Sequence, residues 1–370
     1  MDYPQRNPIP IPASGAFESV STTLESVFDW QYALEQRGLM ALYEKGKANN
    51  WNATELDWST EVSIERMMRE RMQAGSGSFF AEVMQPPTPL DDRGVVELQL
   101  NMNAFMLSQF LHGEQGALLA TAKIVQTVPE EEAKFYAASQ VMDEARHVEV
   151  YHRYLTEKMG IAYPVVPSLQ SLLDDIIRDP RWDVTFLGMQ IMVEGLALAA
   201  FSMMRMMMSG EPLIQDITTR IMADESRHVA FGVLSLGDYY RDELSGNELK
   251  EREDFVIEAT HLLRERLRME PVFERMGFDV PLWTDWADST PFMQGFRQMT
   301  FSKIVPNLKR LGLLTPRVRE AFAKMDLLRF EHLKDSVEEA EPQPPEELVK
   351  LLMEFLNTNV GSDAKPTAAA

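Results

Sequence analysis

Two short motifs in the chain repeat each other and contain residues that bind metal ions. The first reads DEARH (143–147) and the second reads DESRH (224–228). In each motif the glutamate and the histidine are three residues apart, so on a helix they share one face and offer an oxygen and a nitrogen to the same ion. A lone glutamate stands upstream of each motif, Glu114 before the first and Glu194 before the second. The pattern predicts metal chemistry.

The spacing of these residues indicates that a whole helical hairpin is duplicated. Glu114 and Glu194 are 80 residues apart, and Glu144 and Glu225 are 81 apart. Together the two hairpins supply four carboxylates and two imidazoles, and two divalent cations balance four carboxylates electrostatically. The predicted ligands are Glu114, Glu144, His147, Glu194, Glu225 and His228.

The charged neighbours within the motifs cannot all bind metal by geometry. Asp143, Arg146, Asp224 and Arg227 are therefore predicted to surround the histidines and orient them. Hard oxygen donors favour iron, and manganese fits the same ligands. Zinc is less expected, because its catalytic sites keep three protein ligands around one ion.

Three further side chains lie near the motifs. Tyr151 follows His147 by four residues, so its ring could approach a metal ion. An aromatic core residue with a bonded hydroxyl is the interpretation that we favour. His112 and His152 are off the spacing and are predicted not to be ligands.

Composition narrows the chemistry further. The chain has 370 residues and no cysteine, which excludes disulfides, thiolate-bound zinc and iron–sulfur clusters. Its 36 basic and 57 acidic residues give a net charge of -21, which argues against nucleic acid or an anionic membrane as a partner. No signal peptide is evident near the N-terminus, so the cytoplasm is the expected location.

The elements that must position the motifs are long helices, and no alternating strand pattern competes with them. An all-α fold follows, with four bundle helices predicted at about 92–128, 129–159, 183–209 and 212–241. The apolar run from Gly188 to Met208 contains Gln190, Glu194 and Arg205, which a membrane would penalise, so we interpret it as a buried bundle helix. Further helices are expected at about 247–270, 292–311 and 316–339.

These elements suggest a division of the chain into a bundle and its extensions. The predicted parts are a disordered arm (1–15), an N-terminal helical extension (16–93), the bundle (94–243), C-terminal helices (244–340) and a mostly flexible tail (341–370).

The paired motifs resemble those of the ferritin-like di-iron oxygenase superfamily, in particular the bacterial multicomponent monooxygenase hydroxylases, over about residues 94–243. The resemblance implies a ferritin-like four-helix bundle with two iron ions per chain, bridged by Glu144 and Glu225. It also implies that Glu114, Glu144 and Glu225 take part in catalysis, with dioxygen used to oxidise an organic substrate. A separate reductase or ferredoxin must supply electrons, since no flavin, nicotinamide or iron–sulfur motif is present.

Departures from that family leave alternatives open. Leu198 stands where those monooxygenases have a threonine, and Ile221 stands where arylamine N-oxygenases have an additional histidine. Tyr151 instead matches the radical tyrosine of ribonucleotide reductase small subunits, so a radical-generating protein is one alternative. Ferritin-type iron handling is another, although the extensions on both sides of the bundle would obstruct a cage. Desaturases share the ligand set as well.

The substrate is predicted to be small and largely apolar. The side chains expected to shape its pocket are Phe110, Leu118, Leu198, Phe201 and Phe231. A homodimer is one way to bury the apolar faces of the extra helices.

Overall fold

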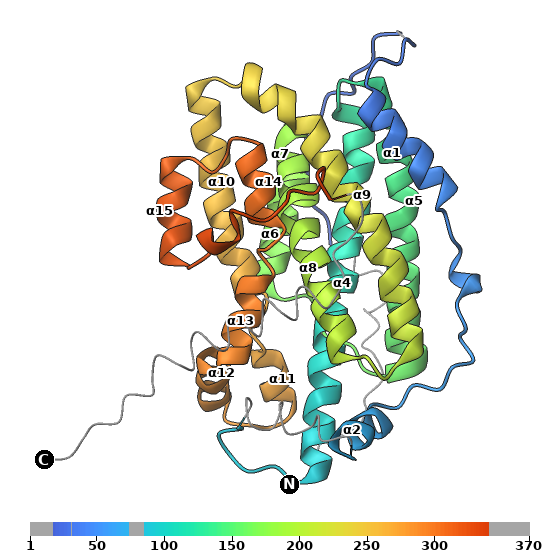
Figure 1. Cartoon of the computed structure of the whole chain (residues 1–370), viewed down its shortest axis with the longest axis vertical. Coiled ribbons are helices and arrows are strands. Elements are labelled where there is room, and N and C mark those ends of the chain that lie inside the picture. The colour runs from blue at the N-terminus through green and yellow to red at the C-terminus, as the bar shows by residue number, and fades with distance from the viewer. Residues whose placement is uncertain (1–17, 31, 74–84, 340–370) are drawn as a thin grey trace, which may run out of the picture.

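The computed structural model describes residues 18–30, 32–73 and 85–339, and every regular element within them is helical (Figure 1). Four long helices lie side by side at the centre. They are α4 (Asp92–Thr127), α5 (Glu131–Arg153), the continuous helix formed by α7 (Trp182–Phe186), η3 (Leu187–Val193) and α8 (Glu194–Met207), and α9 (Pro212–Asp242). The prediction of an all-α, ferritin-like four-helix bundle is confirmed.

Local sequence signals explain where the bundle helices begin and end. The Asp91 side chain accepts a hydrogen bond from the Gly94 amide at 2.8 Å and so caps the start of α4. Pro212 is the first residue of α9, where its missing amide hydrogen costs nothing. Gly160, at φ 65°, ends the π-helical segment η2 (Tyr154–Met159) that continues α5. Two hairpins joined by one crossover result.

The third bundle helix is the most apolar one. The helix segment Trp182–Arg205 is long and apolar enough to span a membrane, with a mean hydropathy of 1.7 over an 18-residue window, yet 94% of that window is buried inside the protein. The predicted buried bundle helix is therefore present. Its middle turns, η3, are π-helical and end directly before Glu194. Such segments are rare and occur often at functional sites.

Shorter helices cover the bundle. In Figure 1, α1 runs along α5 and α9 on one side, and α10, α14 and α15 lie on the other. Their bounds are α1 (Arg37–Ala48), η1 (Ala53–Glu55), α2 (Ile64–Gln73), α6 (Pro167–Arg178), α10 (Gly246–Glu265), α11 (Glu270–Arg275), α12 (Val280–Ser289), α13 (Pro291–Met299), α14 (Ile304–Arg310), α15 (Pro316–Lys324) and η4 (Leu328–Phe330). A buried ion pair joins α10 to the third bundle helix. Arg252 of α10 donates to both carboxylate oxygens of Asp183 of α7, at 2.8 and 2.9 Å.

The C-terminal helices differ from the sequence prediction. The helix expected over 316–339 ends at Lys324, because Asp326 takes the left-handed conformation at φ 57°. The helix expected over 292–311 is two helices, α13 and α14. Beyond the N-terminal extension, three helices were not predicted: α6 in the crossover, α11 and α12. Each has a proline in its first turn (Pro167, Pro271 and Pro281), which is a helix-start signal.

In the predicted N-terminal extension, the described residues 18–30 and 32–36 precede α1 and lie outside any helix. The predicted arm (1–15) and tail (341–370) lie outside the described residues.

Candidate metal centre

The six predicted ligands come together in the middle of the bundle. Glu114 comes from α4, Glu194 from the first residue of α8, and the two Glu-x-x-His pairs from α5 and α9. All six side chains are buried. Ligand atoms of Glu114, Glu144, His147 and Glu225 lie within 4.8 Å of one another, and so do those of Glu144, Glu194 and His228. Glu144 belongs to both groups.

The first group is arranged around one nitrogen of His147. Its Nδ1 lies 3.3 Å from Glu114 Oε2, 3.5 Å from Glu144 Oε2 and 3.3 Å from Glu225 Oε1. Three carboxylates from three different helices thus face one imidazole nitrogen. This donor set suits a hard divalent cation.

Two of these carboxylates also face His228 of the second group. The Nδ1 atom of His228 lies 3.2 Å from Glu144 Oε1 and 3.6 Å from Glu225 Oε2. The two oxygens of Glu144 thus face different histidines, and so do the two oxygens of Glu225. A carboxylate placed between two nitrogen donors in this way can bridge two ions, so the six residues form a site able to bind a metal pair.

The outer nitrogens of both histidines face aspartates of the opposite motif. His147 Nε2 lies 3.1 Å from Asp224 Oδ2, and His228 Nε2 lies 3.3 Å from Asp143 Oδ2. These contacts present Nδ1 of each ring to the centre, because a carboxylate on one nitrogen fixes the tautomer and the orientation of the ring.

Two arginines hold these aspartates in turn. Arg146 donates to Asp143, and also to Asp224 Oδ2 at 3.2 Å. Arg227 donates to Asp224 and lies 3.8 Å from Asp143 Oδ2. The structure therefore places all four charged motif residues around the histidines, with two positive charges facing two negative ones.

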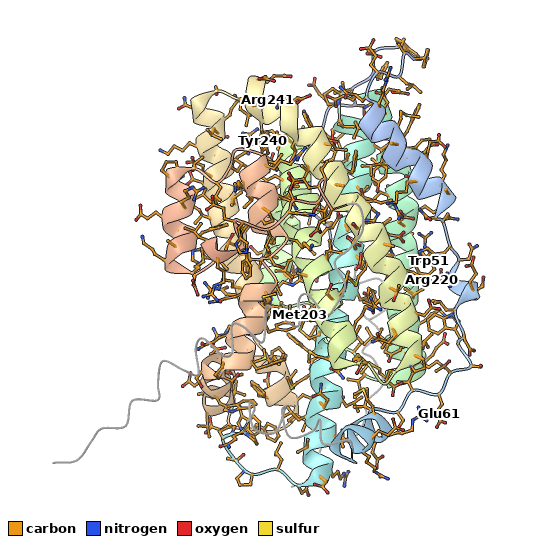
Figure 2. All side chains as sticks on the ribbon, in the orientation of Figure 1. Trp51, Glu61, Met203, Arg220, Tyr240 and Arg241 are labelled. Carbon is orange, nitrogen blue, oxygen red and sulfur yellow. The ribbon has the colours of Figure 1, made fainter. Side chains whose placement is uncertain are left out.

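Sequence reasoning missed two polar side chains at this site. Trp51 Nε1 donates to Asp224 Oδ2 at 2.8 Å, and the guanidinium groups of Arg146 and Arg220 lie over its ring. Figure 2 labels Trp51 and Arg220 beside each other. Gln140 donates to Glu144 Oε1 at 2.8 Å and to Glu194 Oε1 at 3.0 Å. Gln140 precedes Glu144 by one helical turn, and that spacing was a readable signal.

Several carboxylate oxygens at the centre have no hydrogen-bond partner among the described residues. They are Glu144 Oε2, Glu194 Oε2 and both oxygens of Glu225. Burying such atoms without a partner is costly, and bound cations remove that cost. The donor set therefore fits metal ions.

The pKa values of these side chains also reflect the crowding of buried carboxylates. Burial raises the pKa of Glu114 to about 8, although His147 opposes the shift. Burial and the neighbouring Glu225 and Glu144 raise the pKa of Glu194 well above its usual range. The pKa of Glu144 falls despite burial because His228 and His147 are beside it. Two carboxyls thus retain protons that a metal ion would displace.

Of the three further side chains considered near the motifs, Tyr151 lies close to the cluster, and the two histidines do not. Tyr151 is fully buried beside Phe110 and Phe201, whose ring centroids lie 6.2 and 6.0 Å from its own. Its hydroxyl has no partner in the described part of the chain, contrary to the bonded hydroxyl we favoured. His112 points elsewhere, with Nε2 2.9 Å from the Tyr163 carbonyl, and His152 is exposed, so neither joins the cluster.

A small cavity adjoins the cluster. Its lining comes from α4, from η3 and α8 of the third bundle helix, from α9 and from the residue that follows α10: Phe110, Gly113, Glu114, Ala117, Val193, Glu194, Ala197, Phe201, Glu225 and Arg266. Of the five predicted pocket residues, Phe110 and Phe201 line it, whereas Leu118, Leu198 and Phe231 do not. Arg266 was not predicted, since it follows the bundle by more than 20 residues and belongs to no motif.

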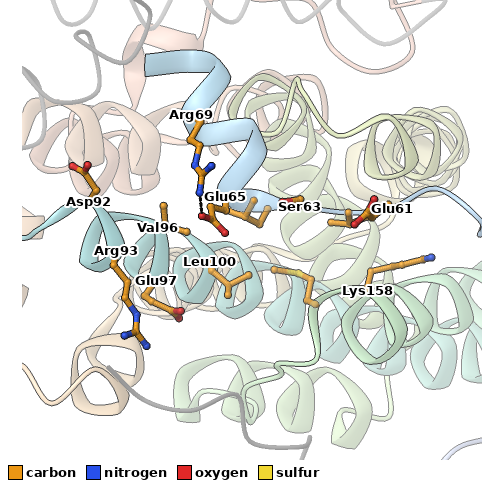
Figure 3. Close-up of a pocket in the computed structure, with 13 residues that line it drawn as sticks. Glu61, Ser63, Glu65, Arg69, Asp92, Arg93, Val96, Glu97, Leu100 and Lys158 are labelled. Atoms are coloured by element: carbon orange, nitrogen blue, oxygen red, sulfur yellow. Dashed lines mark hydrogen bonds and ion pairs between the residues drawn. The ribbon is translucent and has the colours of Figure 1, made fainter. Parts of the chain in front are cut away.

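A larger cavity of about 910 Å³ lies elsewhere, between α2, α4 and η2 (Figure 3). It is lined mainly by charged side chains, among them the ion pair of Arg69 and Glu65. On α4 it reaches Leu100, and Glu114 lies 14 residues further, about 21 Å along a helix that rises 1.5 Å per residue. None of the six cluster residues lines it.

Fold and site together define a ferritin-like four-helix bundle with a buried carboxylate and histidine cluster able to bind two metal ions. No family model matches the chain, and no curated protein matches it. Among solved structures it is similar to a variant of an R2-like ligand-binding oxidase with an anaerobically reconstituted Mn/Fe cofactor. That likeness has a TM-score of 0.45 and 15% identity, and covers 76% of this chain and 94% of the other.

A second similar structure is an R2-like ligand-binding oxidase with an aerobically reconstituted metal cofactor after photoconversion. Its TM-score is 0.40 at 14% identity, over 91% of this chain and 95% of the other. At these TM-scores the likeness does not assign a function to the chain.

Proposed function

We propose that this protein is a non-haem di-iron oxidoreductase that uses dioxygen to oxidise a small organic substrate. The observation that carries the proposal is the position of Glu144, which faces both histidines and belongs to both groups of ligand atoms. A pair of iron ions held there would supply the electrons that reduce dioxygen. Manganese fits the same oxygen and nitrogen donors and belongs in the same tests.

The residues of the chain have distinct parts in this proposal. Glu114, Glu144, His147, Glu194, Glu225 and His228 hold the metal pair. Asp143 and Asp224 fix the orientation of the two imidazoles. Arg146 and Arg227 neutralise the charges of these two aspartates. The surrounding apolar helices exclude water from the centre, which strengthens every charge interaction inside it.

Several parts of the proposal concern the surroundings of the enzyme. Electrons come from a separate reductase or ferredoxin, and the reaction is a monooxygenation, an N-oxygenation or a desaturation. The protein acts in the cytoplasm, and two copies of the chain associate through the helices that cover the bundle.

The experiment that tests the proposal is anaerobic loading with iron(II) followed by rapid mixing with dioxygen. Wild type should bind two irons per chain and show an optical change on mixing, with dioxygen consumed. Glu144→Ala should lose both irons, because Glu144 faces both metal positions. Glu149→Ala, at an exposed position two residues beyond His147 on the same helix, is the matched control and should behave as wild type.

One metal ion or none in the wild type, or the same content in Glu144→Ala, would contradict the proposal. Iron binding without dioxygen uptake under any reductant would retain the site but remove the oxidase function.

A radical-generating protein is the second candidate, and Tyr151 is the observation that favours it. The unpartnered hydroxyl belongs to a ring close enough to Glu114 and His147 for their charges to influence its pKa, which burial raises well above the usual range. After reaction with dioxygen, a tyrosyl signal in electron paramagnetic resonance that disappears in Tyr151→Phe would establish this function. Turnover of a substrate by Tyr151→Phe at the wild-type rate would exclude it.

A further inference from the structure

Arg266 is a buried cation that the proposed chemistry does not use. It directly follows α10, is 2% exposed and lines the cavity beside the cluster together with Glu114 and Glu225. One hydrogen bond holds it, from Nη2 to the Gln109 carbonyl at 3.3 Å. Its Nε and Nη1 have no hydrogen-bond partner among the described residues, and within that part of the chain it forms no ion pair.

A count of charges leaves Arg266 without a counterion. Two divalent ions, as proposed, balance the four carboxylates of the cluster. Around the histidines, the aspartates Asp143 and Asp224 are balanced by Arg146 and Arg227. Among the described residues, Arg266 is then a positive charge beside this centre that forms no ion pair. Glu114, the carboxylate whose charge acts to raise its pKa, is already counted against the metal pair. An unpaired buried charge is strongly destabilising.

Burial alone does not remove this charge. It lowers the pKa of Arg266 to about 10, so the guanidinium stays protonated at neutral pH. Guanidinium presents its donors in a planar fork that matches a carboxylate or a phosphate. Its free donors are therefore suited to an oxyanion entering the cavity.

We infer that Arg266 recognises an anionic group of the substrate, so that the substrate is an organic acid rather than a neutral molecule. This inference rests on the proposed function and names its substrate class. The acid group would pair with the free donors of Arg266, and the reacting part would lie toward Glu114, Glu194 and Glu225, which line the same cavity.

The rest of the lining selects an apolar body for that acid. Val193, Ala197, Phe110 and Phe201 supply it, and the two phenylalanine rings meet edge to face with centroids 4.6 Å apart. The cavity itself holds about 10 Å³, room for one water-sized group. A substrate must therefore displace these side chains as it enters, and a very small acid is the appropriate first probe.

The test compares acetate with acetamide, which has nearly the same shape and no charge, on the metal-loaded full-length protein by calorimetry. Arg266→Met should weaken acetate binding by roughly tenfold or more, the usual contribution of hydrogen bonds to a charged group, and change acetamide binding by less than about twofold. Arg266→Lys should recover part of the loss. Arg264→Met, which removes a nearby cation outside the cavity lining, should leave both affinities unchanged.

Metal content measured on every variant separates this inference from the proposed function. Two metals per chain with unchanged acetate affinity in Arg266→Met, or no acetate binding by the wild type, would overturn the inference and leave the metal centre intact. Loss of metal in Arg266→Met would also overturn it, since Arg266 would then support Glu114 instead of a ligand. A wild type that binds no metal would refute the proposed function, and the inference with it.

Discussion

At the scale of single residues, the centre depends on contacts that cross between the two motifs. Each histidine is oriented by the aspartate of the other helix, at 3.1 Å for His147 and Asp224 and at 3.3 Å for His228 and Asp143. Each aspartate also accepts a hydrogen bond from the arginine of its own motif. A substitution in one motif should therefore alter the orientation of the histidine in the other motif.

Asp224→Asn should lower metal affinity by about 10- to 100-fold, the usual effect of losing a carboxylate behind a metal-bound histidine. Asp143→Asn should have a similar effect through His228. Asp238→Asn is the control on the same helix as Asp224, because Asp238 is an exposed partner of Arg241 and lies outside the cluster. Metal titration in competition with a chelator measures all three, and equal affinities throughout would show that the aspartates do not support the centre.

At the scale of helices, the ligands are placed by a close approach of α9 to η3. A Cβ atom added at Gly232 of α9 would lie 2.6 Å from Gln190 Cβ, far inside contact distance. Gln190 belongs to the π-helical turns that end directly before Glu194. The lack of a side chain at Gly232 thus lets α9 approach the helix that carries the third glutamate.

Gly232→Ala should push these helices apart, lowering the free energy of unfolding by roughly 1–3 kcal/mol and weakening metal binding. Gly237→Ala, on the same helix with nothing within 4 Å of the added Cβ, should be neutral or stabilising by up to about 1 kcal/mol. Urea denaturation and metal content measure both effects. Equal stabilities of the two variants would show that the close approach relaxes at no cost.

At the scale of the whole molecule, protons and metal ions compete for the same buried groups. Without bound cations, burial raises the pKa of Glu114 from 4.5 to about 8 and that of Glu194 well above 4.5. The pKa values of His147 and His228 are raised well above 6.5, because nearby carboxylates outweigh the opposing effect of burial. Between about pH 5 and 9, these four groups therefore bind more protons in the folded state than in the unfolded chain.

Protein stripped of metal should therefore lose stability as the pH rises from about 5 to 9, because a group with a raised pKa stabilises the fold only while it holds its proton. The lowered pKa values of Glu144 and Asp224 act in the opposite sense, but only as the pH falls below their ordinary values of 4.5 and 3.8. Thermal unfolding in the presence of a chelator measures this trend. Glu114→Gln should reduce its slope.

Added metal should reverse the trend, since it displaces these protons and binds more tightly as the pH rises. A metal-free protein whose melting temperature is constant or rises from pH 5 to 9 would show that the cluster does not hold protons in this way.

Much of the centre could be predicted because its spacing is a local property of helices. Residues three apart share a helix face whatever the rest of the chain does, so the paired motifs and their lone glutamates indicated six ligand candidates and four helices. The same local reasoning was wrong over 316–339. The residues there favour a helix, but the helix ends at Lys324 because the chain turns at Asp326.

By itself, the sequence determined that this protein is an all-α bundle with a duplicated set of metal-binding side chains. Only the tertiary structure decided which partners those side chains meet. Asp143 is one turn from His147 in sequence yet contacts His228, and Trp51 reaches Asp224 across 173 positions. Arg266 joins the cavity from outside the bundle helices. Such contacts depend on how separate helices pack, and no spacing along one helix encodes that.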